Sequence, residues 1–570
     1  MSEPAAVVVG TSGDEVAFAV LAASGAAIER GSLPRISLPA FVAQRRHLRW
    51  VWSDTALWYP PLLEAGVRVT RCRDLRLCHA ILRDSALLDS PEPIRAAREW
   101  DAAAAIEDDD PQPGLFALVG DRPPVGPPQD LAAALAELER QDVAVQASAQ
   151  RGRLELLCAA ESAGALVAAE LRAAGLPWDV DEHERILDDV LGRRPAAGGM
   201  PENMATLAAQ IRTHLGDAQA SIDAPAKLLR SLHRVGVPAQ STSKWELGRY
   251  EHPVIAPLLE YKRLSRLYSA NGWAWLDEWV REGRFRPVYV PAGVVTGRWA
   301  SSGGGALQIP RMLRRAVRAD DGWTFVVADV AQLEPRVLAG MASDRALARA
   351  AHGRDLYAGI VESGAVASRA EAKVAMLGAM YGATTGESGR LVPRLRRTYP
   401  RAMKLVDDAA RTGEEGGVVS TWLGRSCPAA SDGWLRAQRL AAGETGTPTD
   451  RDRARRAAGD RGRFTRNFVV QGTAAEWALA WLGEVRSRLG EIAPVSVGES
   501  APRSGRALGD RPHLAFFLHD ELIVHTPQRC ADAAADIVRQ AAASAGRLLF
   551  GGFPIDFPLD LKITPTAAKD

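Results

Sequence analysis

The chain has 570 residues, of which 47% are hydrophobic and 24% are charged. This length predicts about three to four domains, and the composition is ordinary for a globular protein. The chain contains no run of roughly 20 apolar residues, the length that a membrane helix needs. The first residues lack the pattern of a secretion signal. We therefore expect a cytoplasmic protein with no membrane partner. The net charge of +1 gives no overall argument for nucleic acid.

Local charge is more informative than the total. Seven arginines lie within residues 451–466 and four within residues 311–318, whereas the whole chain has only seven lysines. Such arginine clusters would suit a duplex-binding protein, although a solvated helix face is an equally simple interpretation. The five cysteines are scattered, without a CxxC pair, which favours reduced thiols over metal or disulfide roles.

Residues 1–165 form the first unit of the chain, which we expect to be a small α/β domain. Residues 7–9 and 16–20 predict two strands joined by a Gly/Ser/Asp turn. An acidic run at 107–110 and a proline-rich stretch then predict a loop. Residues 129–175 are alanine-rich and helical in pattern. Amphipathic helical patterns continue over 185–285.

The first motif that indicates chemistry is an apolar strand, residues 324–328, that runs into Asp329. A helix is expected just beyond it, because Pro335 suits a first helical turn. The simpler alternative is that Asp329 only caps this helix.

The second motif is a pair of apolar strands, residues 514–518 and 522–524, that flank His519-Asp520-Glu521. An isolated hairpin usually prefers Gly or Asn at its tip. Two acids beside a histidine between buried strands would be costly unless a metal ion offsets their charge. This segment therefore favours function over a purely structural turn.

The third motif places Arg369, Lys373, Leu377 and Tyr381 four residues apart. On an α-helix these residues form one stripe, with cations at one end and an aromatic ring at the other. That arrangement suits a nucleotide, with its phosphates at the cationic end. An ordinary amphipathic helix is the alternative.

Two further segments gain meaning only in combination. One is Thr296-Gly297-Arg298-Trp299-Ala300-Ser301-Ser302, followed by Leu307-Gln308-Ile309-Pro310. The other contains Arg463, Asn467 and the run Gln471-Gly472-Thr473-Ala474-Ala475-Glu476. Alone, each is a polar turn or the start of a helix.

Together and in this order, the five segments resemble the family A DNA polymerases, typified by bacterial DNA polymerase I. That family shows TGRxSS with LQxIP, DYSQIELR, RxxxKxxxFxxxYG, QGTAAD and HDE, and this chain has TGRWASS, DVAQLEPR, RAEAKVAMLGAMYG, QGTAAE and HDE. The resemblance covers roughly residues 165–570.

The resemblance implies an α/β multidomain fold: a right-hand polymerase of thumb, palm and fingers, preceded by a ribonuclease H-like exonuclease-type domain. We expect that exonuclease-like domain over 1–165 and the polymerase over 166–570. Within the latter, the expected divisions are mainly thumb over 166–285, palm over 286–345, mainly fingers over 346–440, and the return of the fingers with the rest of the palm over 441–570.

The resemblance also implies a monomeric enzyme with a site for DNA synthesis. Its expected substrates are primer–template DNA and deoxynucleoside triphosphates. Asp329 and Asp520 would hold two Mg²⁺ ions about 4 Å apart, with Mn²⁺ as a substitute. Glu521 would be an auxiliary acid, and Lys373 would act on the leaving pyrophosphate. The expected nucleotide-binding residues are Arg369, Lys373, Leu377, Tyr381, Gln332, Glu334 and Tyr357. The expected DNA-binding residues are Arg298, Arg463, Asn467, Gln471 and His519.

Three positions depart from the family pattern. Leu377 stands where the family has an aromatic residue, Tyr357 where it commonly has a histidine, and Val330 where it has a tyrosine. Since the residues for metal and phosphate are intact, we expect activity, with sugar selection and fidelity less defined. DNA repair or gap filling is the expected role, with replication and damage bypass as the alternatives that the sequence leaves open.

The first domain resembles the 3′–5′ exonuclease domain of the family more faintly, through residues 74–82 and 141–146. That activity needs clustered carboxylates for two metal ions. No acid follows Val9 in the first strand, and the places of two further acids correspond to Pro60 and Arg140. We predict that this domain lacks exonuclease activity. A catalytically dead DNA-binding protein and a nuclease are the competing hypotheses for the whole chain.

Overall fold

The computed structural model describes residues 3–102, 126–195, 199–302, 305, 309–382, 386–444 and 446–568. The acidic run at 107–110 and the Leu307-Gln308 pair of the sequence motifs lie outside these residues. The chain divides into two compact units. Unit 1 comprises Met1–Gly175, Val288–Gly303 and Asp321–Thr564, and unit 2 comprises Leu176–Pro287, Gly304–Asp320 and Pro565–Asp570.

The N-terminal part of unit 1 is built on a five-stranded sheet with the order β3-β2-β1-β4-β5. Its strands are β1 (Pro4–Ser12), β2 (Glu15–Ala22), β3 (Ala27–Pro34), β4 (Arg49–Trp52) and β5 (Arg71–Asp74). The first three strands are antiparallel, while β4 and β5 run parallel to β1. This order and these directions are those of the predicted ribonuclease H-like fold, and β1 and β2 are the two strands that the sequence predicted.

Helices cover both faces of this sheet because consecutive residues of its central strands β1 and β4, such as Val7 and Val8, are apolar and face opposite sides. They are α1 (Leu38–Gln44), α2 (Thr55–Trp58), α3 (Pro60–Glu64), α4 (Leu75–Asp84), α5 (Glu92–Ala96), α6 (Leu131–Ala147) and α7 (Arg151–Ala174). One buried cluster joins Trp50 of β4 to Leu166 of α7. Another joins Val8 and Val51 to Ala134 of α6. The boundary predicted between 165 and 166 falls inside the continuous helix α7.

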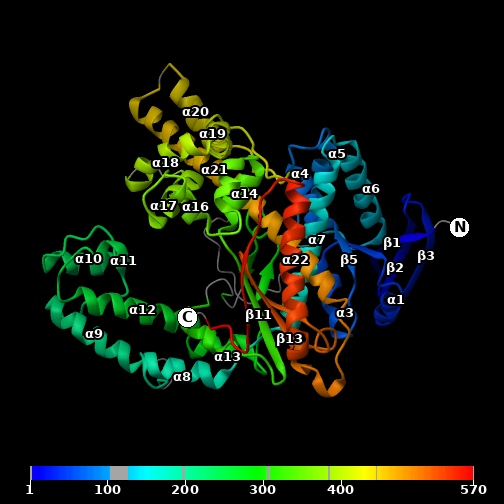
Figure 1. Ribbon diagram of the computed structural model, residues 1–570, viewed down its shortest axis with the longest axis horizontal. Helices are drawn as coiled ribbons and strands as arrows, with labels where there is room; N and C mark the ends of the chain where they lie inside the picture. The colour runs from blue at the N-terminus through cyan, green and yellow to red at the C-terminus, as the bar shows by residue number, and fades with distance from the viewer. Residues whose placement is uncertain are drawn as a thin grey trace. The chain divides into compact units, whose positions relative to one another are not determined.

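The palm of unit 1 is a four-stranded antiparallel sheet with the order β12-β13-β11-β14. The strands are β11 (Trp323–Val330), β12 (His513–Leu518), β13 (Glu521–Pro527) and β14 (Leu559–Thr564). A two-stranded sheet, β9 (Val288–Val290) and β10 (Ala300–Ser302), accompanies it. Helix α22 (Ala531–Phe550) packs against β11, β13 and β14, and Figure 1 shows it beside these strands.

The part of unit 1 that the sequence predicts mainly as fingers, which we call the fingers, is helical, and most of its helices share one buried core that includes Leu356, Met376 and Val406. Their helices are α14 (Leu333–Met341), α15 (Arg345–Ala351), α16 (Leu356–Glu362), α17 (Arg369–Tyr381), α18 (Gly386–Thr398), α19 (Pro400–Glu414), α20 (Asp432–Ala442) and α21 (Pro448–Leu489). Helix α21 has 42 residues and packs on α19 at one end and on α22 and α7 further along. It begins at a capping box formed by Thr447 and Asp450.

Unit 2 corresponds in sequence to the predicted thumb and is mainly helical. Its helices are α8 (Val180–Leu191), α9 (Glu202–Leu215), α10 (Pro225–Arg234), α11 (Lys244–Leu247), α12 (Ile255–Asn271) and α13 (Trp273–Trp279). A small sheet of β6 (Leu176–Pro177), β8 (Arg284–Phe285) and β7 (Val280–Arg281) completes it. Trp178, Trp275 and Phe285 form an aromatic cluster, with ring centroids 4.9–5.6 Å apart.

The mixed α/β, multidomain architecture expected from the sequence is confirmed. Within the described ranges, no helix has both the length and the apolar composition to cross a membrane. The four cysteines at 72, 78, 158 and 427 are buried, and Cys530 is partly exposed.

Candidate active site

Asp329 lies near the end of the central palm strand. Six of the eight residues of β11 are buried, while Asp329 itself is half-buried. The next residues turn sharply: Gln332 adopts a left-handed φ of 50° and α14 begins at Leu333. Pro335 therefore sits in the first turn of α14, as the sequence predicted.

Asp520 lies in the two-residue connection between β12 and β13. The preceding residue, His519, has a φ of 55° in the left-handed region, which Gly or Asn adopts most easily in such hairpins. A non-glycine residue held there costs about 1–3 kcal/mol. The hairpin thus tolerates local strain to keep a histidine and an aspartate at its tip.

The backbone brings these two aspartates together. The N–H of Val330 donates to the carbonyl oxygen of Asp520 over 2.9 Å, and Asp329 is paired across the strands with Glu521. Burial, and then the negative charge of Asp329, raise the pKa of Asp520 to about 6. Two carboxylates that repel each other in this way are suited to share a cation.

The donor set fits magnesium. Carboxylate oxygens are the ligands that Mg²⁺ prefers, and it is commonly held by one or two carboxylates together with substrate phosphates and water. The described residues contain no group of three or more His, Cys, Asp or Glu side chains that could hold a metal ion alone. Asp329 and Asp520 would therefore leave coordination positions for a substrate.

Two other acids accompany the pair. Glu521 is 2% exposed and starts β13. Asp560, which the sequence interpretation overlooked, is the cross-strand partner of Asp329 on β14 and is exposed. The signal for Asp560 would have been its position in the last alternating strand, but no sequence feature placed that strand beside β11.

Glu334, in the first turn of α14, connects two other predicted residues. It forms an ion pair with Arg298 and accepts a hydrogen bond of 2.6 Å from the Tyr381 hydroxyl. Burial, and then this hydrogen bond, raise the pKa of Tyr381. The structure therefore joins residues from three separate sequence motifs at one carboxylate.

Helix α17 presents the predicted stripe on one face. Its opposite face is buried through Ala375, Gly378 and Ala379. On the stripe, Arg369 and Lys373 are exposed, Leu377 is half-buried against the fingers core, and Tyr381 is 37% exposed. Gly382 ends the helix in the left-handed conformation.

Asp355 organises the cationic end of this stripe. It caps α16 and accepts a hydrogen bond of 2.7 Å from Arg369, and Gln332 donates to it over 3.3 Å. The Arg369 guanidinium also lies 5.6 Å from the ring centroid of Tyr357. Burial, and then Glu334, raise the pKa of Tyr357 to about 12. The sequence analysis assigned no role to Asp355, although it lies only two residues before Tyr357.

The predicted DNA-binding residues in and before the QGTAAE segment share one face of α21. Gln471 accepts a hydrogen bond of 3.2 Å from the Thr296 hydroxyl, next to Arg298 in the chain. Asn467 is half-buried and Arg463 is exposed. At Gly472 an added Cβ would lie 2.4 Å from Thr421, so only glycine permits this close approach.

Glu476, the acid of QGTAAE, has a structural position. It is buried, which raises its pKa to about 7, and it accepts hydrogen bonds from the Thr421 hydroxyl and from the Leu423 N–H, the latter over 2.9 Å. The motif thus fixes the 421–425 loop beneath the face that carries Gln471.

His519 stands beside the same cluster. Burial, and then the positive charge of Arg298, lower the pKa of this histidine. Its imidazole is therefore held in the neutral form, which can accept as well as donate a hydrogen bond.

A model of the family described as DNA polymerase family A matches residues 197–565, which is more than half of the chain. The chain belongs to DNA polymerase family A. It is 32% identical over 324 residues to DNA polymerase I of Chloroflexus aurantiacus, covering 52% of this chain and 31% of that protein. It is 25% identical over 468 residues to the thermostable DNA polymerase I of Thermus aquaticus, covering 76% and 46%.

This family A chain thus aligns with between about a third and a half of the length of these relatives. A solved structure, the POL domain of Pol1 from M. smegmatis in complex with DNA primer-template and dNTP, has the same fold with a TM-score of 0.66. The two share 17% sequence identity, and the match covers 99% of this chain and 95% of that one.

The N-terminal domain of this family A protein also carries a carboxylate pair. Asp54 lies two residues after β4 and Asp74 ends β5, so both lie where the parallel strands end. The sequence interpretation placed the expected acid at Pro60 and missed Asp54. The signal available was the apolar run Trp50-Val51-Trp52 that leads into it.

All four oxygens of this pair already accept hydrogen bonds. Asp54 accepts from Ala56 N–H over 3.0 Å and from Arg76 over 2.7 Å. Asp74 accepts from Thr55 N–H over 2.7 Å and from Leu77 N–H over 2.9 Å. The residues are 1% and 0% exposed. They cap two helices and have no surface that a substrate could reach.

The end of β1 is closed as well. An added Cβ at Gly10 would lie 2.2 Å from the backbone nitrogen of Leu131, and Thr11 N–H donates to Gln129 over 2.7 Å. The segment that leads into α6 therefore covers the strand end where an exonuclease needs its first acids. Arg140, at the place of another expected acid, forms an ion pair with Glu137.

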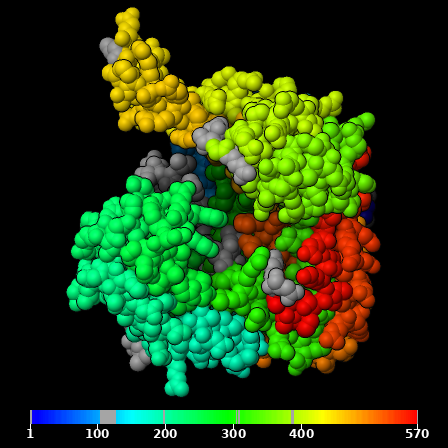
Figure 2. Space-filling view, turned by 60° about the vertical axis from the view of Figure 1, so that its left-hand side comes forward, coloured from blue at the N-terminus to red at the C-terminus, as the bar shows by residue number. Residues whose placement is uncertain are grey.

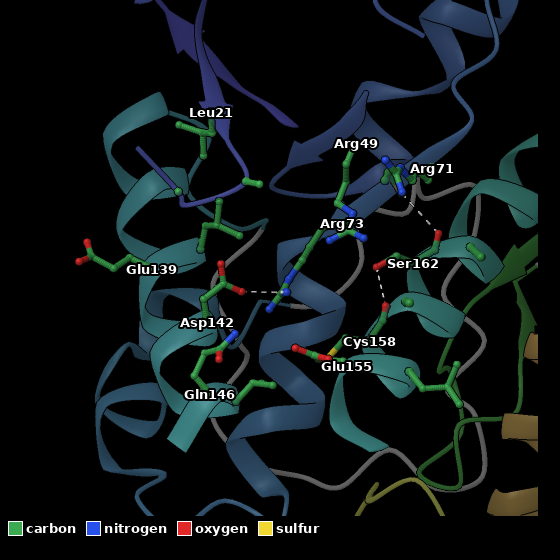
Figure 3. A pocket seen from close by; sticks show the side chains of 18 of the residues that line it. Leu21, Arg49, Arg71, Arg73, Glu139, Asp142, Gln146, Glu155, Cys158 and Ser162 are labelled. Carbon is green, nitrogen blue, oxygen red and sulfur yellow. Dashed lines mark hydrogen bonds and ion pairs between the residues drawn. The ribbon is translucent and has the colours of Figure 1, made fainter. Parts of the chain in front are cut away.

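A cleft of about 1580 Å³ lies at the other end of β4 and β5 from Asp54 and Asp74, among β4, β5, α6, α7 and α21. Figure 3 shows Arg49, Arg71 and Arg73 on its strand wall, with Arg73 reaching Asp142 over 3.0 Å. Burial, and then the charges of Arg71 and Arg73, lower the pKa of Arg49. A wall of three guanidinium groups is unlike a two-metal nuclease centre.

Proposed function

We propose that this family A protein adds deoxynucleotides to the 3′ end of a DNA primer under the direction of a template. The observation that carries the proposal is the half-buried Asp329–Asp520 pair at the end of the palm sheet. In the reaction the primer 3′ oxygen forms a bond to the α-phosphorus, and the bond between the α-phosphorus and the bridging oxygen breaks to release pyrophosphate.

Asp329 and Asp520 would hold two Mg²⁺ ions, or Mn²⁺ in their place. When bound, such ions stabilise the charge on the attacking and leaving oxygens. Glu521 adds negative charge from a buried position across the strands from Asp329, which strengthens the attraction of this strand end for cations.

Arg369 and Lys373 of α17 bind the triphosphate. Both are exposed at the cationic end of the helix, and fixed cations stabilise charge that develops on phosphate oxygens in the transition state. Lys373 donates a proton to the leaving pyrophosphate. Gln332 and Tyr357 support this end, since Gln332 contacts the Asp355 that orients Arg369 and Tyr357 packs against the Arg369 guanidinium.

Glu334 and Tyr381 select the sugar and close over the nascent base pair. The hydrogen bond between them fixes the tyrosine ring, so that the carboxylate and ring together restrict the space for a 2′-hydroxyl. Leu377 lies one helical turn from Tyr381 on the same stripe and faces the sugar from the side.

Arg298, His519, Gln471, Asn467 and Arg463 contact the primer and the template. The support is their grouping: Arg298 joins Glu334 in an ion pair, its charge acts on His519, and Gln471 is hydrogen-bonded to Thr296. A neutral His519 can hydrogen-bond to the primer terminus.

The N-terminal domain, in this proposal, is without 3′–5′ exonuclease activity, because its acids are saturated by hydrogen bonds and the end of β1 is covered. One chain carries every residue of the polymerase site, which supports a monomeric enzyme. We assign it to gap filling during DNA repair in the cytoplasm, with primer–template DNA and deoxynucleotides as its substrates.

Primer extension tests the proposal. Asp329→Asn and Asp520→Asn should each abolish extension, since losing a metal site removes several kcal/mol of transition-state stabilisation, while primer–template affinity stays nearly unchanged. Asp560→Asn is the matched control, because Asp560 also pairs with Asp329 across the strands but is exposed; its activity should be retained. Substantial extension by either of the first two variants would refute the metal site.

A further inference from the structure

A two-helix arm extends from the fingers. We define the arm as α20 together with residues 448–460 of α21. No described residue of α20 is buried, and Ala454 is the only buried residue of α21 before Gly462. Figure 2 shows this yellow segment projecting from the rest of the fingers. A segment with so little core contributes little to the stability of the fold, so its sequence is free to serve a surface role.

The arm and the predicted template-binding face belong to one helix. An α-helix turns by about 100° per residue, and 18 residues make five full turns. Arg453 therefore lies directly in line with Gln471, and Arg456, Arg463 and Asn467 fall within about 80° to one side of that line. Asp460 falls about 20° to the same side, and we call this row of six residues the α21 stripe. It is about 27 Å long at 1.5 Å per residue.

The outer part of the stripe is cationic and exposed. Arg453 and Arg456 are exposed; among the described residues neither is in an ion pair, although the charge of Arg453 contributes to lowering the pKa of Asp450. Asp460 is the one acid on the stripe, and it is paired with Arg463. On α20, Arg436 and Arg439 add positive charge, against Asp432.

The other arginines of the arm point elsewhere. Arg451 and Arg455 are about 160° from the line of the stripe, on opposite sides of it, and both are exposed. Arg455 forms an ion pair with Asp452. The arm therefore holds two arginine pairs of equal charge on the same helix, of which only one continues the face that carries Asn467 and Gln471.

We propose that Arg453 and Arg456 bind the phosphodiester backbone of the DNA substrate beyond the base pair being formed. This inference rests on the proposed function, because Arg463, Asn467 and Gln471 give the stripe its contact with the template. From Arg463 the stripe continues outward by about 15 Å to Arg453, so it reaches DNA that the polymerase site itself does not hold.

The side chains of the outer stripe are suited to bind the DNA backbone and not the bases. Arginine binds phosphate oxygens through a planar fork of donors, and such contacts release counterions without reading sequence. Between Arg453 and Arg463 the stripe has no amide or aromatic side chain for base recognition; its members there are Arg456 and Asp460. The contact should therefore be independent of sequence and sensitive to salt.

The test compares Arg453→Ala/Arg456→Ala with the control Arg451→Ala/Arg455→Ala in equilibrium DNA binding. Three labelled substrates share one primer duplex: the first has a single-nucleotide template overhang, the second a long single-stranded overhang, and the third a downstream duplex after a one-nucleotide gap. The slope of log affinity against log salt is measured for each. Thermal melting establishes that both variants are folded.

The stripe variant should lose about two units of salt slope and about tenfold in affinity at low salt on a substrate that extends beyond the site. It should bind the single-nucleotide overhang like the parent, and the control pair should match the parent throughout. A loss on the long overhang assigns the backbone to single-stranded template, and a loss only with downstream duplex assigns it to duplex.

Equal slopes for all three proteins on every substrate would overturn the proposal, as would equal losses in the stripe and control variants. Failure of the proposed function is separate, because it would appear as absent primer extension by the parent on the single-nucleotide overhang, whatever the binding slopes.

Discussion

Two pairs of aspartates in this molecule sit at the ends of β-strands, and they differ in what surrounds their oxygens. Asp54 and Asp74 of the N-terminal sheet are fully buried, and each oxygen accepts a hydrogen bond from a helix N-terminus or from Arg76. Asp329 and Asp520 of the palm are half-buried and repel each other. Carboxylates whose oxygens are all hydrogen-bonded by the fold hold structure, and a half-buried pair of mutually repelling carboxylates is suited to bind metal ions.

A raised pKa alone does not distinguish the palm aspartates from the N-terminal aspartates, as Asp74 shows. Burial, and then Asp54, raise the pKa of Asp74 to about 6, and that of Asp520 is raised to a similar value by burial and Asp329. Only the palm pair combines the raised pKa with partial exposure. The following experiments test whether the acids of the N-terminal domain act on stability and the residues of the polymerase site on chemistry.

The largest expected effect concerns the stability of the N-terminal domain. Glu170 of α7 is 4% exposed and accepts hydrogen bonds from Arg68, Arg486 and Tyr59. Although burial alone would raise it, Arg486 and Arg68 lower the pKa of Glu170 to about 2. Glu170→Gln removes the charge and leaves the buried Arg486 and the partly buried Arg68 without their carboxylate partner, so it should lower the free energy of unfolding by about 3–5 kcal/mol at neutral pH.

This loss should depend on pH in a defined window. Because the pKa of Glu170 is lower in the folded state, its stabilisation is complete above the ordinary pKa of 4.5 and disappears as pH falls towards 2. Denaturant unfolding of parent and variant from pH 7 to pH 3 measures the difference. Glu155→Gln, on the exposed face of the same helix, is the control. A constant difference between parent and Glu170→Gln over this range would contradict the assigned cause.

Next in size is the loss of rate on removing Lys373. This exposed side chain on α17 should donate to the leaving phosphates, so Lys373→Ala should reduce the single-turnover insertion rate by about 10²–10³-fold. Lys404→Ala, at an exposed lysine on α19 that pairs with Asp408, should have no such effect. If Lys373→Ala lowers only nucleotide affinity and leaves the rate at saturation unchanged, Lys373 binds the triphosphate but takes no part in the chemical step.

How far the sequence predicts this site depends on whether a residue's neighbours are local. Local patterns of strands and helices predicted three segments, each with polar residues where apolar ones or a simple turn would be usual: Asp329 before a turn, the His519–Glu521 tip and the Arg369–Tyr381 helix. The structure has these elements where they were expected. The roles assigned to their residues stay predictions.

The rest depends on contacts between distant segments. Asp560 lies beside Asp329 only because β14 pairs with β11, and Asp54 escaped notice because the faint resemblance of its domain directed attention to Pro60. The continuity of α21 was equally hidden, since its arginine-rich start was open to interpretation as a solvated helix face. Periodicity shows which face a residue occupies, and strand pairing over more than 200 residues does not follow from it.

The smallest effect concerns selection of the sugar. Leu377 has no polar group to replace a missing 3′-hydroxyl, so the parent should discriminate against dideoxynucleotides. Leu377→Tyr should relax that discrimination by about one to two decades, as expected for a hydrogen bond worth about 1–3 kcal/mol. Leu377→Phe adds the ring without the hydroxyl and should leave the ratio of insertion efficiencies unchanged. Equal use of both nucleotides by the parent would show that Leu377 does not face the sugar.

The central claim is that the palm aspartates act on DNA and the N-terminal aspartates do not. One labelled primer with a mismatched 3′ end, incubated in Mg²⁺ with the parent and with Asp520→Asn, tests both halves of it. We expect the parent to lengthen the primer when deoxynucleotides are present, Asp520→Asn to leave it unextended, and neither protein to shorten it when they are omitted. Extension by Asp520→Asn, or metal-dependent shortening by either pure protein, would contradict the account.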